Sequence, residues 1–196
     1  MIRGGDVALL GMVVMMSCAP ARAERGSTAA PAATGTSRNP IAAFMQGMIG
    51  HHAQALDMTK LVSARSSHPS VKLLAERIDV SQKDEIVLMQ RWLRGRGHDV
   101  PDDDAHVHAA MGHGELTPGM LTREQLEQLA AERGPPFDRL FLQQMIRHHE
   151  GALQMVARLL ATNRNLDAET FRFVSDVDAD QRGEIQRMQS LLRSIP

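Results

Sequence analysis

Hydrophobic positions recur at alternating steps of three and four residues along four stretches of the chain. Such spacing places apolar side chains on one face of an α-helix, and its average of about 3.5 residues is typical of helices that pack in a left-handed bundle. It predicts helices over residues 40–66, 69–94 and 135–162, and a fourth that ends near residue 195. The recurring positions, apolar except for one or two polar residues in each helix, are Phe44, Met48, His51, Ala55, Met58 and Val62; Ala75, Ile78, Gln82, Glu85, Met89 and Trp92; Phe141, Met145, His148, Ala152, Met155 and Leu159; and Val174, Val177, Gln181, Glu184, Met188, Leu191 and Ile195.

The connections between these helices differ in length. Short breaks near residues 67–69 and 163–165 make the first and second helices, and the third and fourth, antiparallel neighbours. Residues 95–134 form a long crossover, in which a capping box at 122–125 predicts a short helix to about residue 133. We therefore predict an all-α fold, a ferritin-like four-helix bundle made of two antiparallel helical hairpins.

The two hairpins carry the same motif. Residues 48–58 read MIGHHAQALDM, and residues 145–155 read MIRHHEGALQM. On the helix that follows each of them, QKDEIVLMQ at 82–90 returns as QRGEIQRMQ at 181–189. The chain is therefore an internal duplication. Because a pseudo-twofold axis relates the two copies, we expect their histidine faces to meet in the core.

Composition and charge restrict the type of hydrophobic core and the classes of partner that we expect. The 196 residues include 13 methionines and 9 histidines but only 3% aromatic residues, which favours helices packed through aliphatic side chains over a β-sandwich. The formal net charge of −1 gives no sign of nucleic-acid binding or of electrostatic adhesion to a membrane surface. We expect neither kind of partner.

The N-terminal segment has the features of an export signal. Arg3 precedes an apolar run over residues 7–16 that is too short to span a bilayer as a mature helix. Two processing sites compete: a lipoprotein-type site that would lipidate Cys18, and an A-x-A site at 21–23 for ordinary secretion. We expect a signal peptide over 1–23, a flexible linker over 24–39 and the bundle over 40–196. The protein would then lie on the periplasmic or extracellular side, and a lipid on Cys18 would be its only membrane contact.

Histidines in a bundle core need a physical reason, because a buried imidazole without a partner costs about 1–3 kcal/mol. One explanation is a metal-free polar layer, in which the glutamates and glutamines of the second and fourth helices satisfy His51 and His148. The other is a soft metal ion, since thioether and imidazole donors together favour Cu(I) over Mg²⁺, Ca²⁺ or Mn²⁺. A di-iron site is disfavoured, because one glutamate per hairpin supplies too few carboxylates.

A second group of metal-ligand types lies in the crossover. It comprises His98, His106, His108, Met111, His113 and Met120. Histidine-rich tracts often bind metal, and an exposed polar loop is the alternative. The sequence contains no Gly-rich phosphate loop, no Ser-His-Asp order and no His-Glu-x-x-His motif, and Cys18 is its only thiol. We therefore expect a binding protein, not an enzyme, with a redox enzyme as a third alternative.

In these motifs the chain resembles the DUF305 family. The resemblance rests on the repeated Phe-x-x-x-Met-Ile-x-His-His-x-x-Ala-x-x-Met, on Glu-Ile-x-x-Met-Gln in the following helix, and on Pro-Gly-Met at 118–120, and it covers residues 40–193. It implies a ferritin-like bundle, usually exported in bacteria, and some members are implicated in extracytoplasmic copper binding and resistance. The residues that match the family's motif are Met48, His51, His52, Met58, Glu85, Met89, Met120, Met145, His148, His149, Met155, Glu184 and Met188.

The combined expectation is an exported, lipid-anchored bundle that binds copper, with Cu(I) favoured, and sequesters it or hands it on. The motif residues would hold the ion, and His106, His108, Met111 and His113 would form a secondary site that captures or releases it. Its partners would be the metal ion and a protein that delivers or accepts copper. The alternative from another class is a metal-free structural or interaction module with a buried His–Glu layer.

Overall fold

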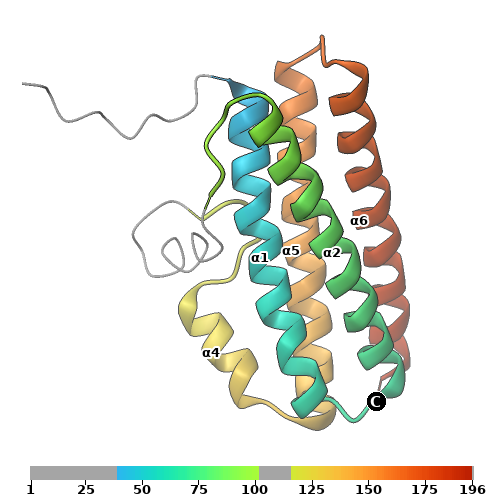
Figure 1. The fold of residues 1–196 in the computed structure, drawn as a ribbon. Helices are drawn as coiled ribbons and strands as arrows, with labels where there is room; N and C mark the ends of the chain where they lie inside the picture. The colour runs from blue at the N-terminus through green and yellow to red at the C-terminus, as the bar shows by residue number, and fades with distance from the viewer. Residues whose placement is uncertain (1–38, 102–115, 196) are drawn as a thin grey trace, which may run out of the picture. The chain divides into compact units, whose positions relative to one another are not determined.

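The structure, a computed structural model, describes residues 39–101 and 116–195. Four long helices, α1 (Pro40–Arg65), α2 (Pro69–Gly95), α5 (Gly134–Thr162) and α6 (Ala168–Ser194), form a bundle, and the short helix α4 (Arg123–Ala131) lies outside it (Figure 1). The described part of the chain contains no strand. The predicted all-α bundle of two hairpins joined by a crossover is confirmed.

Local signals set the helix ends within one or two residues of their predicted places. Asn39 caps α1 by accepting hydrogen bonds from the backbone N–H groups of Ile41 and Ala42 at 2.9 and 3.3 Å. Thr122 and Gln125 form the capping box that opens α4. Beyond the end of α2, Gly97 has a φ of +70°, a left-handed conformation that glycine adopts without a steric penalty.

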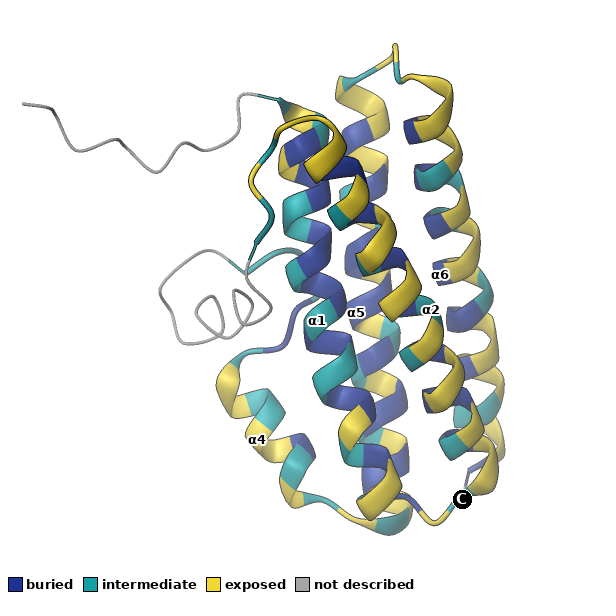
Figure 2. Ribbon diagram, viewed as in Figure 1, coloured by how far each residue is buried: buried dark blue, intermediate teal, exposed yellow. Residues whose placement is uncertain are grey.

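Each long helix turns its predicted hydrophobic face inward (Figure 2). All the recurring positions are buried except Met155 and Leu191, which are half-buried. α1 packs against α2 and α5, and α6 packs against α5 and α2, as two paired antiparallel hairpins require. The apolar side chains form two clusters, one towards each end of the bundle, and a polar layer of histidine, glutamate and glutamine lies between them.

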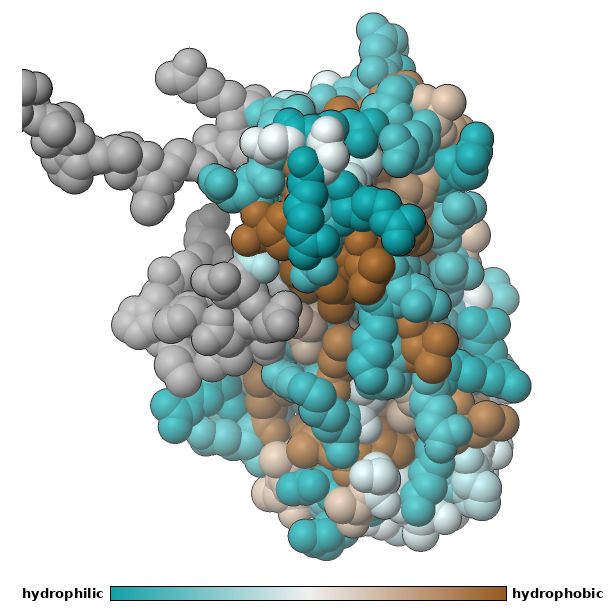
Figure 3. All heavy atoms as spheres, viewed as in Figure 1, coloured by the Kyte–Doolittle hydropathy of each residue, from teal (hydrophilic) through white to brown (hydrophobic). Residues whose placement is uncertain are grey.

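The outer face is mostly hydrophilic in the view of Figure 3, with hydrophobic side chains emerging between polar ones. On α2, Leu73, Val80, Val87 and Leu88 are 47–59% exposed, so they take no part in the polar layer. No helix in the described ranges combines the length and the hydropathy that crossing a membrane requires.

Candidate metal centre

The four motif histidines lie together in the middle of the core. His51, His52, His148 and His149 are each at most 1% exposed. The rings of His51 and His148 are in contact between α1 and α5, with their centroids 3.8 Å apart and their planes tilted by 38°. The histidine faces of the two hairpins therefore meet in the core, as the pseudo-twofold axis predicts.

Two histidine–glutamate pairs flank this contact. His52 Nε2 lies 2.5 Å from Glu85 Oε2, and His149 Nε2 lies 2.6 Å from Glu184 Oε2. A carboxylate only accepts hydrogen bonds, so each imidazole donates through Nε2. The pairing assumed in the metal-free alternative is wrong, because the glutamates bond the second histidine of each motif and not the first. One residue further along a helix is a turn of about 100°, which points the second histidine at the other helix of its own hairpin.

The crossover supplies the partner of His51. His51 Nε2 lies 3.0 Å from Pro118 O, and because a carbonyl can only accept, neutral His51 carries its proton on Nε2. One turn later, Gln54 binds both backbone groups of Leu121: its Nε2 donates to the carbonyl at 3.0 Å, and its Oε1 accepts from the N–H at 2.7 Å. Residues 117–121, which we call the docked crossover, are thus fixed to α1 at both ends.

Two glycines allow the docked crossover to lie on α5. Gly119 has a φ of +83°, and a Cβ atom there would lie 2.6 Å from Arg147 O. A Cβ atom on Gly151 would lie 1.9 Å from Pro118 O. Neither distance leaves room for a side chain, so both positions require glycine. Arg147 Nη2 also donates to Gln125 Oε1 at 3.1 Å, which ties the start of α4 to the same helix.

Four buried ring nitrogens of the layer have no hydrogen-bond partner: His51 Nδ1, His52 Nδ1, His148 Nε2 and His149 Nδ1. In three of these four histidines the other ring nitrogen is bonded to a carbonyl or a carboxylate. Proteins orient metal-binding histidines in this way, since the second nitrogen is then left with its lone pair. The three histidines are therefore arranged as metal ligands are.

The glutamines do not complete the layer. Gln82 Oε1 and Gln181 Nε2 are buried and unpartnered, and so is Glu85 Oε1. A buried polar atom without a partner costs about 1–3 kcal/mol. The layer is therefore not the closed hydrogen-bond network that a purely structural role favours.

Burial keeps the central imidazoles neutral. Desolvation, and then the charge of His52, lowers the pKa of His51 to about 3, although the hydrogen bond to Pro118 acts in the opposite direction. Burial and the neighbouring imidazoles hold the pKa of His148 well below its usual value. Because a metal binds the neutral imidazole, both rings are in the ligating form at neutral pH.

The motif methionines lie on both sides of the histidine layer and do not converge on one point. One apolar cluster contains Met58, Met145 and Met188. The other contains Met48 and Met89, with Met155 packed against it. Soft donors therefore border the imidazoles towards both ends of the bundle.

The arrangement narrows the kinds of metal site. In the described ranges, no three His, Asp, Glu or Cys side chains are placed to share one ion, which disfavours carboxylate-rich sites there. An ion also cannot lie between His51 and His148, because two ring nitrogens each about 2 Å from one ion hold their rings further apart than the observed contact. What remains is one or two imidazoles combined with a thioether.

The predicted crossover site is only partly described. His106, His108, Met111 and His113 lie outside the described residues, as does Cys18. Met120, in the docked crossover, is 6% exposed and belongs to neither apolar cluster. His98 stacks on Trp92, with ring centroids 5.9 Å apart, and its Nε2 accepts a hydrogen bond at 3.3 Å from Asn39 Nδ2, so it lies apart from the histidine layer.

Sequence reasoning does not single out Gln54 or Gly151, although these residues hold and accommodate the docked crossover. They occupy the same position of the two repeats, three residues after the first histidine. The signal in the sequence was the difference between the repeats at this position, an amide side chain in one copy and a glycine in the other.

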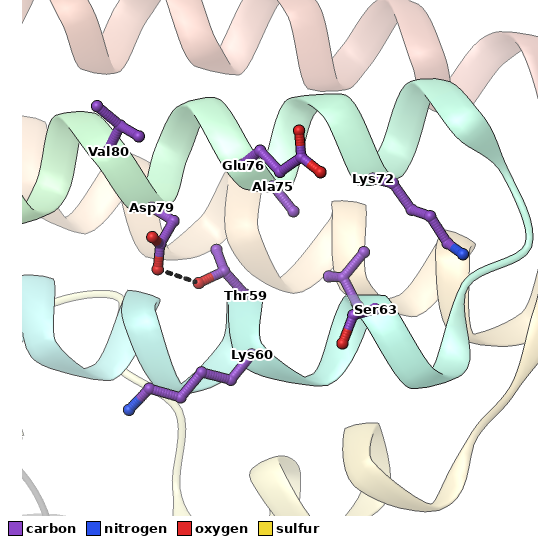
Figure 4. A pocket seen from close by; sticks show the side chains of 9 residues that line it. Thr59, Lys60, Ser63, Lys72, Ala75, Glu76, Asp79 and Val80 are labelled. Atoms are coloured by element: carbon purple, nitrogen blue, oxygen red, sulfur yellow. Dashed lines mark hydrogen bonds between the residues drawn. The ribbon is translucent and has the colours of Figure 1, made fainter.

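A groove on the outer face between α1 and α2 contains none of these donors (Figure 4). Its side chains include Lys60, Lys72 and Glu76, and Thr59 Oγ1 donates to Asp79 Oδ1 at 3.5 Å. The lining has neither histidine nor methionine, so we assign the groove no part in metal binding.

The chain is similar to proteins of one family. The sequence profile of DUF305, a domain of unknown function, matches residues 42–192. A DUF305 fragment from Deinococcus radiodurans has 31% identity and a TM-score of 0.67, over 79% of this chain and 96% of that chain. A DUF305 protein from Streptomyces coelicolor, predicted to be secreted, has 27% identity and a TM-score of 0.66, over 79% and 93% of the two chains.

CopM has the same fold. Its Cu(I)-bound form has 26% identity and a TM-score of 0.61, over 79% of this chain and 96% of CopM, and its Cu(II)-bound form has 29% identity and a TM-score of 0.64 over the same shares. CopM is also known in an Ag-bound form. Among curated proteins, none matches the chain. Because the family profile spans most of the sequence and the solved structures share its bundle, the chain belongs to the DUF305 family.

Proposed function

We propose that this protein binds copper outside the cytoplasm, with Cu(I) as the favoured ion, and that it sequesters the ion or passes it on. The observation that carries the proposal is the group of buried, neutral imidazoles whose free ring nitrogens have no protein partner. A metal ion would satisfy nitrogens that otherwise destabilise the fold. The protein would act as a binding protein, not as an enzyme.

The neighbouring donors favour Cu(I). Thioether sulfur is a soft ligand that binds Cu(I) well and binds Mg²⁺, Ca²⁺ or Mn²⁺ poorly. Since no three harder ligands meet among the described residues, an ion with a low coordination number and a preference for sulfur and imidazole suits the layer best. The similarity to CopM, with its Cu(I)-, Cu(II)- and Ag-bound forms, supports the same class of metal.

The motif residues would have different roles in metal binding. His51 or His148, each with a thioether such as Met48 or Met145 on its own helical face, would hold an ion. Glu85 and Glu184 would orient the second histidine of each pair. The remaining motif methionines, together with His106, His108, Met111 and His113, would supply alternative ligands, through which the ion could be exchanged with a delivery or acceptor protein.

Titration of the mature domain with Cu(I) against a competing chelator tests the proposal. Replacing both central histidines (His51→Ala with His148→Ala) is expected to weaken Cu(I) binding at least tenfold, about 1.4 kcal/mol, while the bundle stays helical. His98→Ala is the matched control, because that histidine lies outside the layer, and it is expected to leave the affinity unchanged.

The His–Glu pairs favour a second candidate function, a metal-free module in which the layer only specifies packing. The same titration separates the two. If the double variant binds Cu(I) as tightly as the parent while its melting temperature collapses, the layer is structural. Removing His106, His108 and His113 together is expected to reduce the copper capacity without abolishing binding.

Location is part of the proposal. A lipid on Cys18 would hold the bundle at the outer face of the membrane, a place in keeping with its similarity to a DUF305 protein predicted to be secreted. Cys18→Ala is then expected to move the protein from the membrane fraction to the soluble exported fraction. Unchanged membrane association in fractionated cells would show that something else anchors it.

A further inference from the structure

A pocket of about 310 Å³ opens where α1, α5 and the docked crossover meet. It is lined by Gly47 and Phe44 from α1, Met155 and Leu159 from α5, and Thr117 and Pro118 from the docked crossover, together with residues at the ends of α1 and α5. Pro118 connects the pocket to the histidine layer, because its carbonyl accepts the hydrogen bond of His51 at 3.0 Å. The pocket wall is therefore one hydrogen bond away from a candidate ligand.

Met155 gives this pocket a soft donor. Of the methionines in the described ranges, Met155 alone is not buried. Every other methionine there is at most 6% exposed. An ion that approaches the described part of the protein from solvent can therefore meet a sulfur ligand at Met155 before any other.

The rest of the lining disfavours hard cations. It contains no carboxylate and no histidine, and its one charged side chain is Arg158, whose positive charge opposes multivalent cations most strongly. Thr117 Oγ1, on the same wall, is buried and unpartnered. The donors on offer are a thioether and uncharged oxygens, a set that suits a soft monovalent ion.

The internal repeat shows how the pocket arises. Met58 is the equivalent of Met155 in the first repeat, and it is fully buried. The pocket wall facing Met155 is Gly47, whose added Cβ would lie 3.5 Å from Met155 Cε, whereas the equivalent residue in the second repeat is Gln144. The first repeat thus has a glycine where the second has a long side chain, and only one of the two equivalent methionines is open.

We infer that this pocket is an outer binding site through which a soft monovalent ion reaches the histidine layer, with Met155 as its first ligand. The inference rests on the proposed function, because it assumes that the layer is the destination. The ion binds Met155, and it then passes to the unprotonated Nδ1 of His51, while Nε2 keeps its proton and its hydrogen bond to Pro118.

Methionine oxidation tests the outer site with Ag(I) as the probe, since Ag(I) stays monovalent in air. When the metal-free protein is treated with dilute peroxide, Met155 is expected to be oxidised at least tenfold faster than Met58, as measured by peptide mass spectrometry. One equivalent of Ag(I) is expected to slow the oxidation of Met155 at least tenfold. If the protein binds Ag(I) in equilibrium dialysis and Met155 stays unprotected, the outer site is wrong while the proposed function stands. If no Ag(I) binds, the proposed function fails first.

Gly47→Gln tests the route, because it gives the first repeat the side chain of the second and fills the pocket. A glutamine is better tolerated inside a helix than a glycine, so the variant is expected to fold. Stopped-flow uptake of Ag(I) is expected to slow at least tenfold, with an equilibrium affinity within about threefold of the parent. The matched control, Gln144→Ala in the second repeat, is expected to leave the rate unchanged. Uptake by Gly47→Gln at the parent's rate would overturn the inference.

Discussion

The two hairpins of this bundle are alike in one layer of the core and different one turn away from it. His52 with Glu85 and His149 with Glu184 form the same buried pair in both hairpins, at 2.5 and 2.6 Å. Three residues after the first histidine the hairpins differ. Gln54 is hydrogen-bonded to the docked crossover, whereas Gly151, without a side chain, only lets it approach α5. The first histidines differ too, since His51 is bonded to Pro118 and His148 Nε2 has no partner.

This difference indicates which features belong to the shared framework and which to a function that needs only one copy. A single crossover can dock on a twofold arrangement in one place only, so it must break the symmetry. The two copies differ at the equivalent positions 47 and 144, and at 54 and 151. Gly47 lines the pocket that contains Met155, and Gln54 and Gly151 hold and accommodate the crossover, whose Pro118 carbonyl fixes the proton of His51. The His–Glu pairs are the framework that both hairpins share. We place metal exchange on the side of the bundle where the crossover docks.

Removing one buried carboxylate is expected to have the largest effect on the common framework. Glu184→Ala leaves His149 without its partner and also removes one of the two acceptors of the Ser81 hydroxyl, so unfolding in urea is expected to show a loss of about 4 kcal/mol. Glu85→Ala is expected to destabilise less, because Glu85 is more exposed and has no such second bond. Glu150→Ala, at an exposed position of α5, serves as the control and is expected to stay within about 0.5 kcal/mol. Losses below 1 kcal/mol for both buried variants would show that the pairs are not the framework.

The second-largest effect is expected from filling the space in which the docked crossover lies on α5. Gly151→Ala forces a Cβ atom to 1.9 Å from Pro118 O, so we expect a loss of about 3 kcal/mol in the free energy of unfolding. Gly183→Ala is the matched control, since its Cβ would meet only the flexible end of Arg187 at 3.4 Å. Alanine favours a helix, so the control is expected to be more stable by up to about 1 kcal/mol. Equal effects at the two positions would contradict the close docking of the crossover.

Acid is expected to destabilise the fold through the central imidazoles. His51 has a pKa of about 3 in the folded protein and about 6.5 when unfolded, so the unfolded chain binds more protons between these values. The stability that comes from His51 is therefore complete above pH 6.5 and falls as the pH decreases, by about 2 kcal/mol at pH 5. Urea unfolding at several pH values measures this, and His148→Leu is expected to reduce the slope. A flat profile between pH 7 and 5 would mean that the imidazoles are not held neutral.

The smallest effect is expected from removing the side chain that binds the docked crossover to α1. Gln54→Ala leaves the N–H and the carbonyl of Leu121 without their partners, at a cost of about 1–2 kcal/mol. Hydrogen exchange at the Leu121 amide is expected to become at least tenfold faster, and Gln154→Ala, on the exposed face of α5, is expected to leave it unchanged. If Leu121 exchanges as slowly as in the parent, something other than Gln54 holds the crossover.

The sequence predicts the helices, their pairing and the buried faces because periodicity and caps are local properties that determine helix geometry. It predicts the meeting of His51 and His148 as well, since the repeat requires it. It does not predict which histidine each glutamate bonds, because that depends on how far each helix is rotated about its axis. Nor does it predict the contact of Pro118 with His51, or the lowered pKa of His51, which depend on how the crossover and the neighbouring helices exclude water.

The central claim is that thioethers take part in holding the ion. The most direct measurement compares the parent with a variant in which Met48, Met58, Met145 and Met155 are all leucine, in Cu(I) and Zn(II) titrations against competing chelators. Leucine nearly keeps the volume of methionine, so folding is expected to change little. We expect Cu(I) affinity to fall at least tenfold while Zn(II) affinity, which depends on imidazole and carboxylate, stays the same. A variant that folds and binds Cu(I) as tightly as the parent would show that the methionines only fill the core.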